Sequence, residues 1–125
     1  MKSKIIAKSI LLCGSRNWDN REIIKTALKK IQYPKATPYV IHGVAKGADT
    51  IGKEEAEKLG FVTKAYEADW DRYGKKAIYL RNIDMINSNP HVVLAFCNYL
   101  PRCKGTSMTI ELAKQHGIPV ILFSE

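Results

Sequence analysis

Short apolar runs alternate with longer segments of mixed polarity along the chain. The runs are rich in Val, Ile and aromatic residues, which favour β-strands. They span residues 9–13, 39–42, 61–66, 92–96 and 119–123. Glycine or proline stands next to several of them, as is usual at strand ends. We therefore predict five short strands.

The segments between these runs have the composition and periodicity of helices. They span residues 20–31, 48–59, 77–87 and 106–116, and the second and fourth are followed by a glycine, a common residue just past a helix end. In the first, apolar residues share one face and lysines fall elsewhere, as on a helix with one solvated side. The apolar set is Ile23, Ile24, Ala27, Leu28 and Ile31, and the lysines are Lys25, Lys29 and Lys30.

Strand and helix alternate from one end of the chain to the other, which indicates a parallel sheet covered by helices on both faces. Because crossovers between parallel strands are right-handed, five strands predict the order 3-2-1-4-5 with a switch point between strands 1 and 4. The 125 residues suffice for one domain. We predict an α/β fold, a single doubly wound parallel sheet over residues 1–125.

Composition narrows the class of protein. No apolar run approaches the roughly 18 residues of a membrane span, and residues 1–9 do not read as a signal peptide. We expect a soluble, cytoplasmic protein without a membrane partner. The three cysteines lack C-x-x-C spacing and the histidines lack metal spacing, so no disulfide framework, metal site or cofactor is expected. The cysteines are interpreted as buried or incidental thiols.

The net charge of +8 is concentrated near the N-terminus. Residues 1–35 hold nine Lys or Arg and two acids, whereas residues 36–125 are close to balanced. A basic surface of this kind is either a solvated helix face or a binding face for a polyanion. Both interpretations stay open, and the second allows weak nucleic-acid binding.

Three unusual loops follow predicted strands, at residues 14–18, 43–49 and 98–107. Parallel strands bring such loops to one edge of the sheet, and ligands of open α/β sheets bind at that edge near the switch point. The loops at 43–49 and 98–107 lead into helices, whose first N–H groups lack internal partners and favour anions. The pattern predicts an anion site, although it matches neither the P-loop nor the G-x-G-x-x-G fingerprint.

The residue types in the loops suit such a site. Ser15 and Arg16 offer a hydroxyl and a fork of N–H donors. Asp49 is expected in a first helical turn, where it serves either the helix dipole or the binding of a ribose or base. Gly105, Thr106 and Ser107 open the last helix, where the hydroxyls either cap the helix or bind an anion.

The loops also carry a family resemblance. The motifs are "GSRNW", "HGVAKGAD", "ADWDRYGKKA", "RNIDMI", "GTSMTIELA" and "GIPV", in this order between about residues 10 and 123. Together they resemble the YspA-like family of the SLOG superfamily, which includes the Smf/DprA and Lonely Guy proteins. The resemblance implies a Rossmann-like domain associated with nucleotides, nucleotide-derived ligands or nucleic acid.

By this resemblance each loop acquires a role. The first ligand loop would contain Gly14, Ser15 and Arg16, and the second His42, Gly43, Lys46, Gly47, Ala48 and Asp49. Arg81 and Asn82 would match the arginine-containing helix, and Gly105, Thr106 and Ser107 the phosphate-binding helix start. The family usually has a glycine where Val44 stands and an arginine where Lys46 stands.

Three functions follow from the resemblance. The leading hypothesis is that the protein binds a nucleotide or nucleotide-derived small molecule, as a sensor or a nucleotide-processing enzyme. A homo-oligomer is compatible with this hypothesis. The second is a DprA-like nucleic-acid-binding module. The third is a Lonely Guy-like phosphoribohydrolase with Arg81 and Asp49 as catalytic residues. Against it, Thr109 stands where that family has a glutamate, and Glu111 should face away from Thr106.

Overall fold

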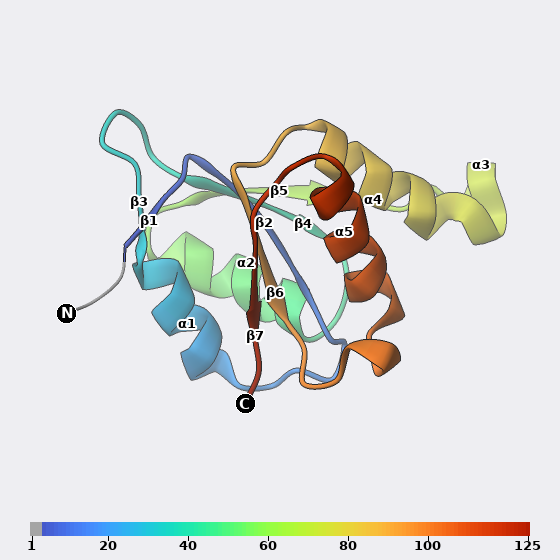
Figure 1. Cartoon of the computed structure of the whole chain (residues 1–125), viewed down its shortest axis with the longest axis horizontal. Coiled ribbons are helices and arrows are strands. Elements are labelled where there is room, and N and C mark those ends of the chain that lie inside the picture. The colour runs from blue at the N-terminus through green and yellow to red at the C-terminus, as the bar shows by residue number, and fades with distance from the viewer. Residues whose placement is uncertain (1–3) are drawn as a thin grey trace.

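The computed structural model describes residues 4–125 and is built on a five-stranded parallel sheet (Figure 1). The order is β5-β4-β2-β6-β7, which confirms the predicted order. The strands are β2 (Ser9–Gly14), β4 (Tyr39–Gly43), β5 (Val62–Tyr66), β6 (Val92–Phe96) and β7 (Val120–Phe123). The architecture is Rossmann-like, with the switch point between β2 and β6.

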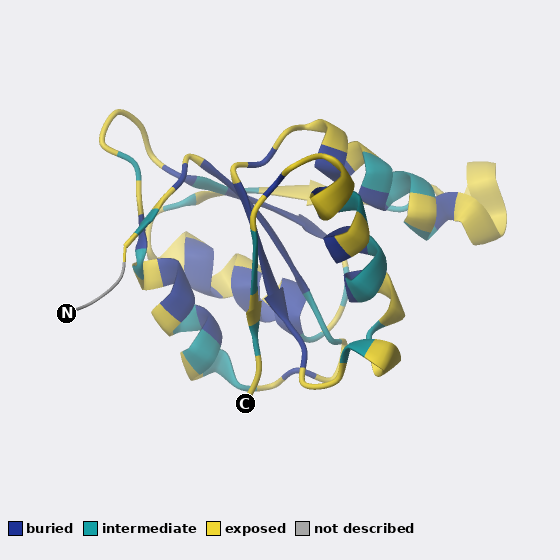
Figure 2. Cartoon of the chain, viewed as in Figure 1, coloured by how far each residue is buried: buried dark blue, intermediate teal, exposed yellow. Residues whose placement is uncertain are grey.

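Helices cover both faces of the sheet. On one face lie α1 (Arg21–Lys29) and α2 (Ala48–Lys58), and on the other α4 (Ala77–Asn87) and α5 (Lys104–Gln115). Two apolar clusters fill the space between the helices and the sheet. One contains Ile24 and Leu28 of α1, and the other contains Met85 and Ile86 of α4. Central strands β2 and β6 are buried on both faces, as Figure 2 shows. This burial explains their continuous apolar runs.

The first helix differs from its predicted span of residues 20–31. The Asn20 side chain accepts a hydrogen bond from the Ile23 N–H (3.3 Å), so Asn20 caps the helix and the helix itself begins at Arg21. At the other end, Ile31 leaves the helix and pairs with Ile5 in a small parallel sheet of β1 (Ile5–Ile6) and β3 (Ile31–Gln32). The apolar periodicity alone could not show this change of backbone conformation.

Two further segments gain structure that was not predicted. Residues 70–76 form α3 (Trp70–Tyr73) and the 3₁₀ helix η1 (Gly74–Lys76), which project beyond α4 in Figure 1. The 3₁₀ helix η2 (Leu100–Arg102) precedes α5, and α5 begins two residues before the predicted start at residue 106. Within residues 4–125, no helix is both long and apolar enough to cross a membrane.

Candidate ligand-binding site

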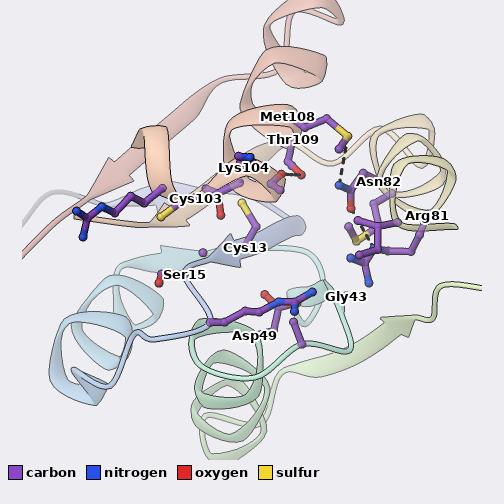
Figure 3. A pocket seen from close by; sticks show the side chains of 18 of the residues that line it. Cys13, Ser15, Gly43, Asp49, Arg81, Asn82, Cys103, Lys104, Met108 and Thr109 are labelled. Atoms are coloured by element: carbon purple, nitrogen blue, oxygen red, sulfur yellow. Dashed lines mark hydrogen bonds between the residues drawn. The ribbon is translucent and has the colours of Figure 1, made fainter. Parts of the chain in front are cut away.

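A cavity of about 560 Å³ opens at the carboxyl ends of β2 and β4, beside the start of α5 (Figure 3). Its wall contains residues from all three of the loops identified in the sequence and from the inner face of α4. The lining is Cys13–Asn17, Gly43, Ala45, Asp49, Ile78, Arg81, Asn82, Met85, Arg102–Thr106, Met108 and Thr109. The switch point therefore coincides with a hollow large enough for a nucleotide-sized ligand.

The first and second loops are fastened together through their backbones. The Ser15 carbonyl accepts hydrogen bonds from the N–H groups of Trp18 (3.2 Å) and Ala48 (3.1 Å). Gly47 has a φ of 73°, and a Cβ atom there would collide with the carbonyls of Ser15 and Arg16. Glycine is thus required at position 47 by both conformation and space. Its contribution to the site is to let the two loops pack closely.

Arg81 reaches from α4 across the second loop. Its Nε donates to Asn82 Oδ1 (3.0 Å) and its Nη1 to the Tyr66 carbonyl (3.4 Å). A Cβ atom at Gly43 would collide with the guanidinium group, so this group lies directly on the glycine backbone. Because Gly43 has no side chain, the guanidinium group of Arg81 can pack against the backbone at this position.

Asp49, the second residue of α2, is buried, with 6% of its surface exposed. Burial raises the pKa of its carboxyl group to about 7, and the neighbouring Arg81 and the backbone of Ala45 and Gly43 oppose this rise. Near neutral pH the group is therefore divided between a carboxylic acid and a carboxylate. Figure 3 shows it on the wall opposite α5, close to Gly43. It can donate to or accept from a polar ligand group there.

The start of α5 forms the opposite wall. Cys103 is the N-cap residue and supplies no side-chain capping bond, while Lys104, Gly105 and Thr106 follow in the first turn and line the cavity. A Cβ atom at Gly105 would have no neighbour within 4 Å, so the approach to this turn is open. The first N–H groups of a helix have no intrahelical acceptor and carry its positive dipole end.

Basic side chains outnumber acidic ones around the cavity. Arg16, Arg81, Arg102 and Lys104 belong to the lining, whereas Asp49 is the only acid among the described lining residues. Since Asp49 is partly protonated near neutral pH, the net charge of the wall is clearly positive. The cavity therefore favours an anionic ligand.

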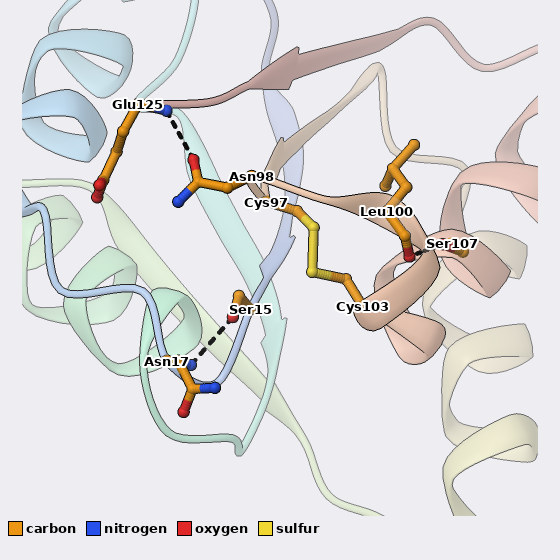
Figure 4. The surroundings of a disulfide bond; sticks show 8 residues. All are labelled: Ser15, Asn17, Cys97, Asn98, Leu100, Cys103, Ser107 and Glu125. Atoms are coloured by element: carbon orange, nitrogen blue, oxygen red, sulfur yellow. Dashed lines mark hydrogen bonds between the residues drawn. A yellow bond between two sulfur atoms is a disulfide. The ribbon is translucent and has the colours of Figure 1, made fainter.

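A disulfide bond joins Cys97, directly after β6, to Cys103 at the start of α5 (Figure 4). The interpretation of all three cysteines as buried or incidental thiols was therefore wrong for two of them, and only Cys13 is a free thiol among the described residues. A separation of six residues in sequence gave no signal, because the pairing depends on how η2 folds back toward β6. The bond holds the third loop at the cavity wall.

The structure places most of the candidate residues at the cavity. Those in its lining are Gly14, Ser15, Arg16, Gly43, Asp49, Arg81, Asn82, Gly105 and Thr106. Lys46 and Gly47 instead border a shallow hollow on the other side of the loops, which also contains Arg16. Ser107 lies outside the lining and its Oγ donates to the Leu100 carbonyl (2.9 Å).

His42 and Ala48 are also absent from the lining. His42 follows Val40 on the α2 face of β4, is buried, and has its Nδ1 2.8 Å from the Gly43 carbonyl. Burial lowers its pKa, which favours the neutral ring. Ala48 is fully buried and donates its N–H to Ser15. Both residues are thus buried next to the second loop and contact its backbone or that of the first loop.

Sequence reasoning missed several lining residues. On α4 these are Ile78 and Met85, which lie at i−4 and i+3 from Asn82, and on α5 they are Met108 and Thr109, which lie at i+3 and i+4 from Gly105. Helical spacing from the assigned residues Asn82 and Gly105 would have identified these neighbours. For Arg102 and Lys104 the available signal was two basic residues beside the expected helix start.

Comparison with known proteins gives a family match and a relative of similar length. A model of the family described as "YspA, cpYpsA-related SLOG family" matches residues 8–73, which include the first two loops. The chain is also 37% identical over 126 positions to the Gene 61 protein of Mycobacterium phage D29, covering 94% of this chain and 98% of that protein. The matched residues include β2, the first two loops and Gly43, against which Arg81 packs. Because the family model covers more than half of the chain, the chain belongs to the YspA, cpYpsA-related SLOG family.

Proposed function

We propose that the protein binds a nucleotide or nucleotide-derived small molecule in the cavity, with a phosphate at the start of α5. The observation that carries the proposal is that four basic residues and an open helix start line one cavity, which has a single acid among its described residues. Membership of the SLOG family supports a nucleotide-related ligand. The volume of about 560 Å³ lies within the usual range of ligand pockets.

In this proposal the phosphate accepts hydrogen bonds from the first-turn amides of α5, at Gly105 and Thr106. Arg16 and Lys104 lie in the same lining and supply positive charge. A guanidinium group can bind two phosphate oxygens at once through its planar fork of donors. Arg81 is held on Gly43 by bonds to Asn82 and Tyr66, so it contributes charge without a large loss of side-chain freedom.

The remainder of the ligand would extend from α5 toward Asp49. The partly protonated carboxyl group can bind sugar hydroxyls or a polar edge of a base. Ile78 and Met85 supply apolar surface on the α4 side. This polarity, anionic at one end and mixed at the other, is that of a nucleoside phosphate.

The test is calorimetric titration with AMP and ADP, together with mass spectrometry of any nucleotide that co-purifies. Arg16→Ala should weaken AMP binding roughly ten- to a hundredfold, the equivalent of a lost charge-assisted hydrogen bond of about 1.5–3 kcal/mol. Arg72→Ala is the matched control, because Arg72 lies on α3 outside the cavity. Equal affinity of wild type and Arg16→Ala, or no nucleotide binding at all, would contradict the proposal.

A second candidate function is hydrolysis of the bond between base and ribose phosphate, which the acid Asp49 beside Arg81 favours. A carboxylate can stabilise the positive charge that builds on the sugar as the base departs. The position of the Lonely Guy glutamate is occupied by Thr109, whose Oγ1 donates to the Gly105 carbonyl (3.1 Å), and Glu111 is exposed outside the lining. Asp49 would have to replace that glutamate.

Chromatography of AMP incubated with the protein distinguishes the two candidates. The binding function predicts intact AMP. Release of adenine that is abolished by both Arg81→Ala and Asp49→Asn, in variants that still fold, would establish the hydrolase and overturn the simple binding function.

A further inference from the structure

The Cys97–Cys103 disulfide is part of the cavity wall as well as a link in the chain. Cys103 lines the cavity and is the N-cap residue of α5, whereas Cys97 is buried behind it, 2% exposed and outside the lining. Cys97 is also anchored to the sheet, because its N–H donates to the Phe123 carbonyl (3.0 Å). The bond therefore fixes the start of α5 relative to the strands.

We propose that this disulfide is a reversible redox switch that sets the affinity of the cavity for its anionic ligand. The identity of the ligand rests on the proposed function, but the coupling rests on the position of Cys103. With the bond formed, the first turn of α5 is held in the geometry that presents its N–H groups to the cavity. Without it, that turn must be ordered when the ligand binds, and this ordering weakens binding.

The reaction requires a dithiol reductant. One thiolate of the reductant attacks Cys103 Sγ from the cavity side, forming a mixed disulfide and releasing Cys97 as a thiolate that takes up a proton. The second thiol of the reductant then attacks the mixed disulfide and releases Cys103. Two electrons and two protons pass to the protein, and the reductant becomes a disulfide.

Cys13 also lines the cavity but does not take part in this exchange. Burial raises the pKa of the Cys13 thiol well above its ordinary range, and the nearby charge of Asp49 acts in the same direction. Since the thiolate is the attacking species, a thiol that stays protonated exchanges poorly. Cys13 therefore provides an internal reference that remains a thiol in both states.

Hydrogen bonds keep the loop partly ordered after reduction. The Leu100 carbonyl accepts from the Cys103 N–H (2.9 Å) and from Ser107 Oγ (2.9 Å), and Asn98 Oδ1 accepts from the Glu125 N–H (2.7 Å). Figure 4 shows the side-chain contacts on either side of the disulfide. The switch is thus expected to change affinity and not to abolish binding. If reduction restores the backbone freedom of about one residue, the cost of ordering that residue again is enough to weaken binding about tenfold.

The coupling is reciprocal. If the oxidised protein binds a ligand about tenfold more tightly, saturating ligand must make the disulfide about tenfold harder to reduce at a fixed ratio of dithiol to disulfide reagent. This second quantity is measured without any titration of affinity.

The experiment compares oxidised and reduced full-length protein, with alkylation and mass spectrometry confirming one free thiol or three. Calorimetry uses AMP and, as a probe of the anion site alone, inorganic pyrophosphate. Cys97→Ala removes the bond and leaves the cavity-lining Cys103 in place. It should bind as weakly as the reduced protein and be indifferent to reductant. Cys103→Ala removes the other cysteine of the disulfide and should behave in the same way.

Equal affinities of the two redox states, or a Cys97→Ala protein that binds as tightly as the oxidised wild type, would overturn the switch. If AMP fails to bind while pyrophosphate distinguishes the two states, the nucleotide proposal fails and the switch stands. If neither probe binds in either state, hydrogen exchange decides. Reduction should speed exchange of the Lys104, Gly105 and Thr106 amides, and unchanged exchange there would overturn the switch.

Discussion

Burial of Asp49 should make the stability of the protein depend on pH in a direction opposite to that of most acids. The pKa of this carboxyl group rises from 3.8 to about 7 on folding, chiefly through desolvation. As pH increases from 4 to 7, the unfolded chain loses this proton while the native state keeps it. Stability falls wherever the native state binds more protons than the unfolded state.

The magnitude follows from the size of the shift. A difference of about three pKa units corresponds to roughly 4 kcal/mol of stability, present at acid pH and lost by about pH 8. This is a large fraction of the roughly 5–15 kcal/mol by which domains are stable. Asp49→Asn removes the titrating group and keeps the shape of the side chain. The variant should therefore gain stability relative to wild type as pH rises.

Urea denaturation of wild type and Asp49→Asn, at pH 4 and at pH 8, measures this effect. Every other titrating group is common to both proteins, so its contribution cancels in the difference between their unfolding free energies. The difference should move by roughly 4 kcal/mol in favour of Asn between the two pH values. A difference that stays constant with pH, or moves toward wild type, would refute the burial argument.

Two further predictions concern the loops and the basic helix. Gly47→Ala should lower the free energy of unfolding more than Gly60→Ala. Both glycines have a positive φ, which costs alanine about 1–2 kcal/mol, but only a Cβ atom at position 47 collides with neighbouring carbonyls. Equal losses in thermal or urea denaturation would count against close packing of the first two loops. If α1 binds single-stranded DNA, affinity should fall with salt at a log-log slope of about −0.7 per neutralised phosphate, with dissociation constants of roughly 10⁻⁴–10⁻⁶ M. Replacing Lys25, Lys29 and Lys30 with Gln should flatten this slope in fluorescence titrations, and submicromolar binding at physiological salt would instead favour the nucleic-acid function.

The sheet was predictable because each strand and helix leaves a local pattern, and the handedness of crossovers then fixes their order. The small β1–β3 sheet was not, since Ile31 fits the apolar stripe of α1 equally well in sequence. The same limit applied at Trp70–Tyr73, where a polar segment forms a short helix with no buried residue. In both places the conformation is decided by contacts or caps that hydrophobic periodicity does not register.

The site was predictable to the level of loops. Strand ends bring residues such as Ser15 and Asp49 to one cavity, so position in the topology was sufficient for them. For His42, alternation along β4 turns the side chain toward α2, and a motif match cannot reveal this direction. The cavity-facing role of Cys103 depends on the disulfide and on η2, which are tertiary features.

In the proposed function a ligand phosphate lies at the start of α5, between the three loops. Chemical-shift mapping of the backbone amides during titration with AMP tests this position of the phosphate. If the phosphate lies there, the largest changes should fall on Gly105, Thr106 and Ser15, with little change along α1. Changes concentrated on Arg21–Lys29, or none at the start of α5 under saturating AMP, would contradict it.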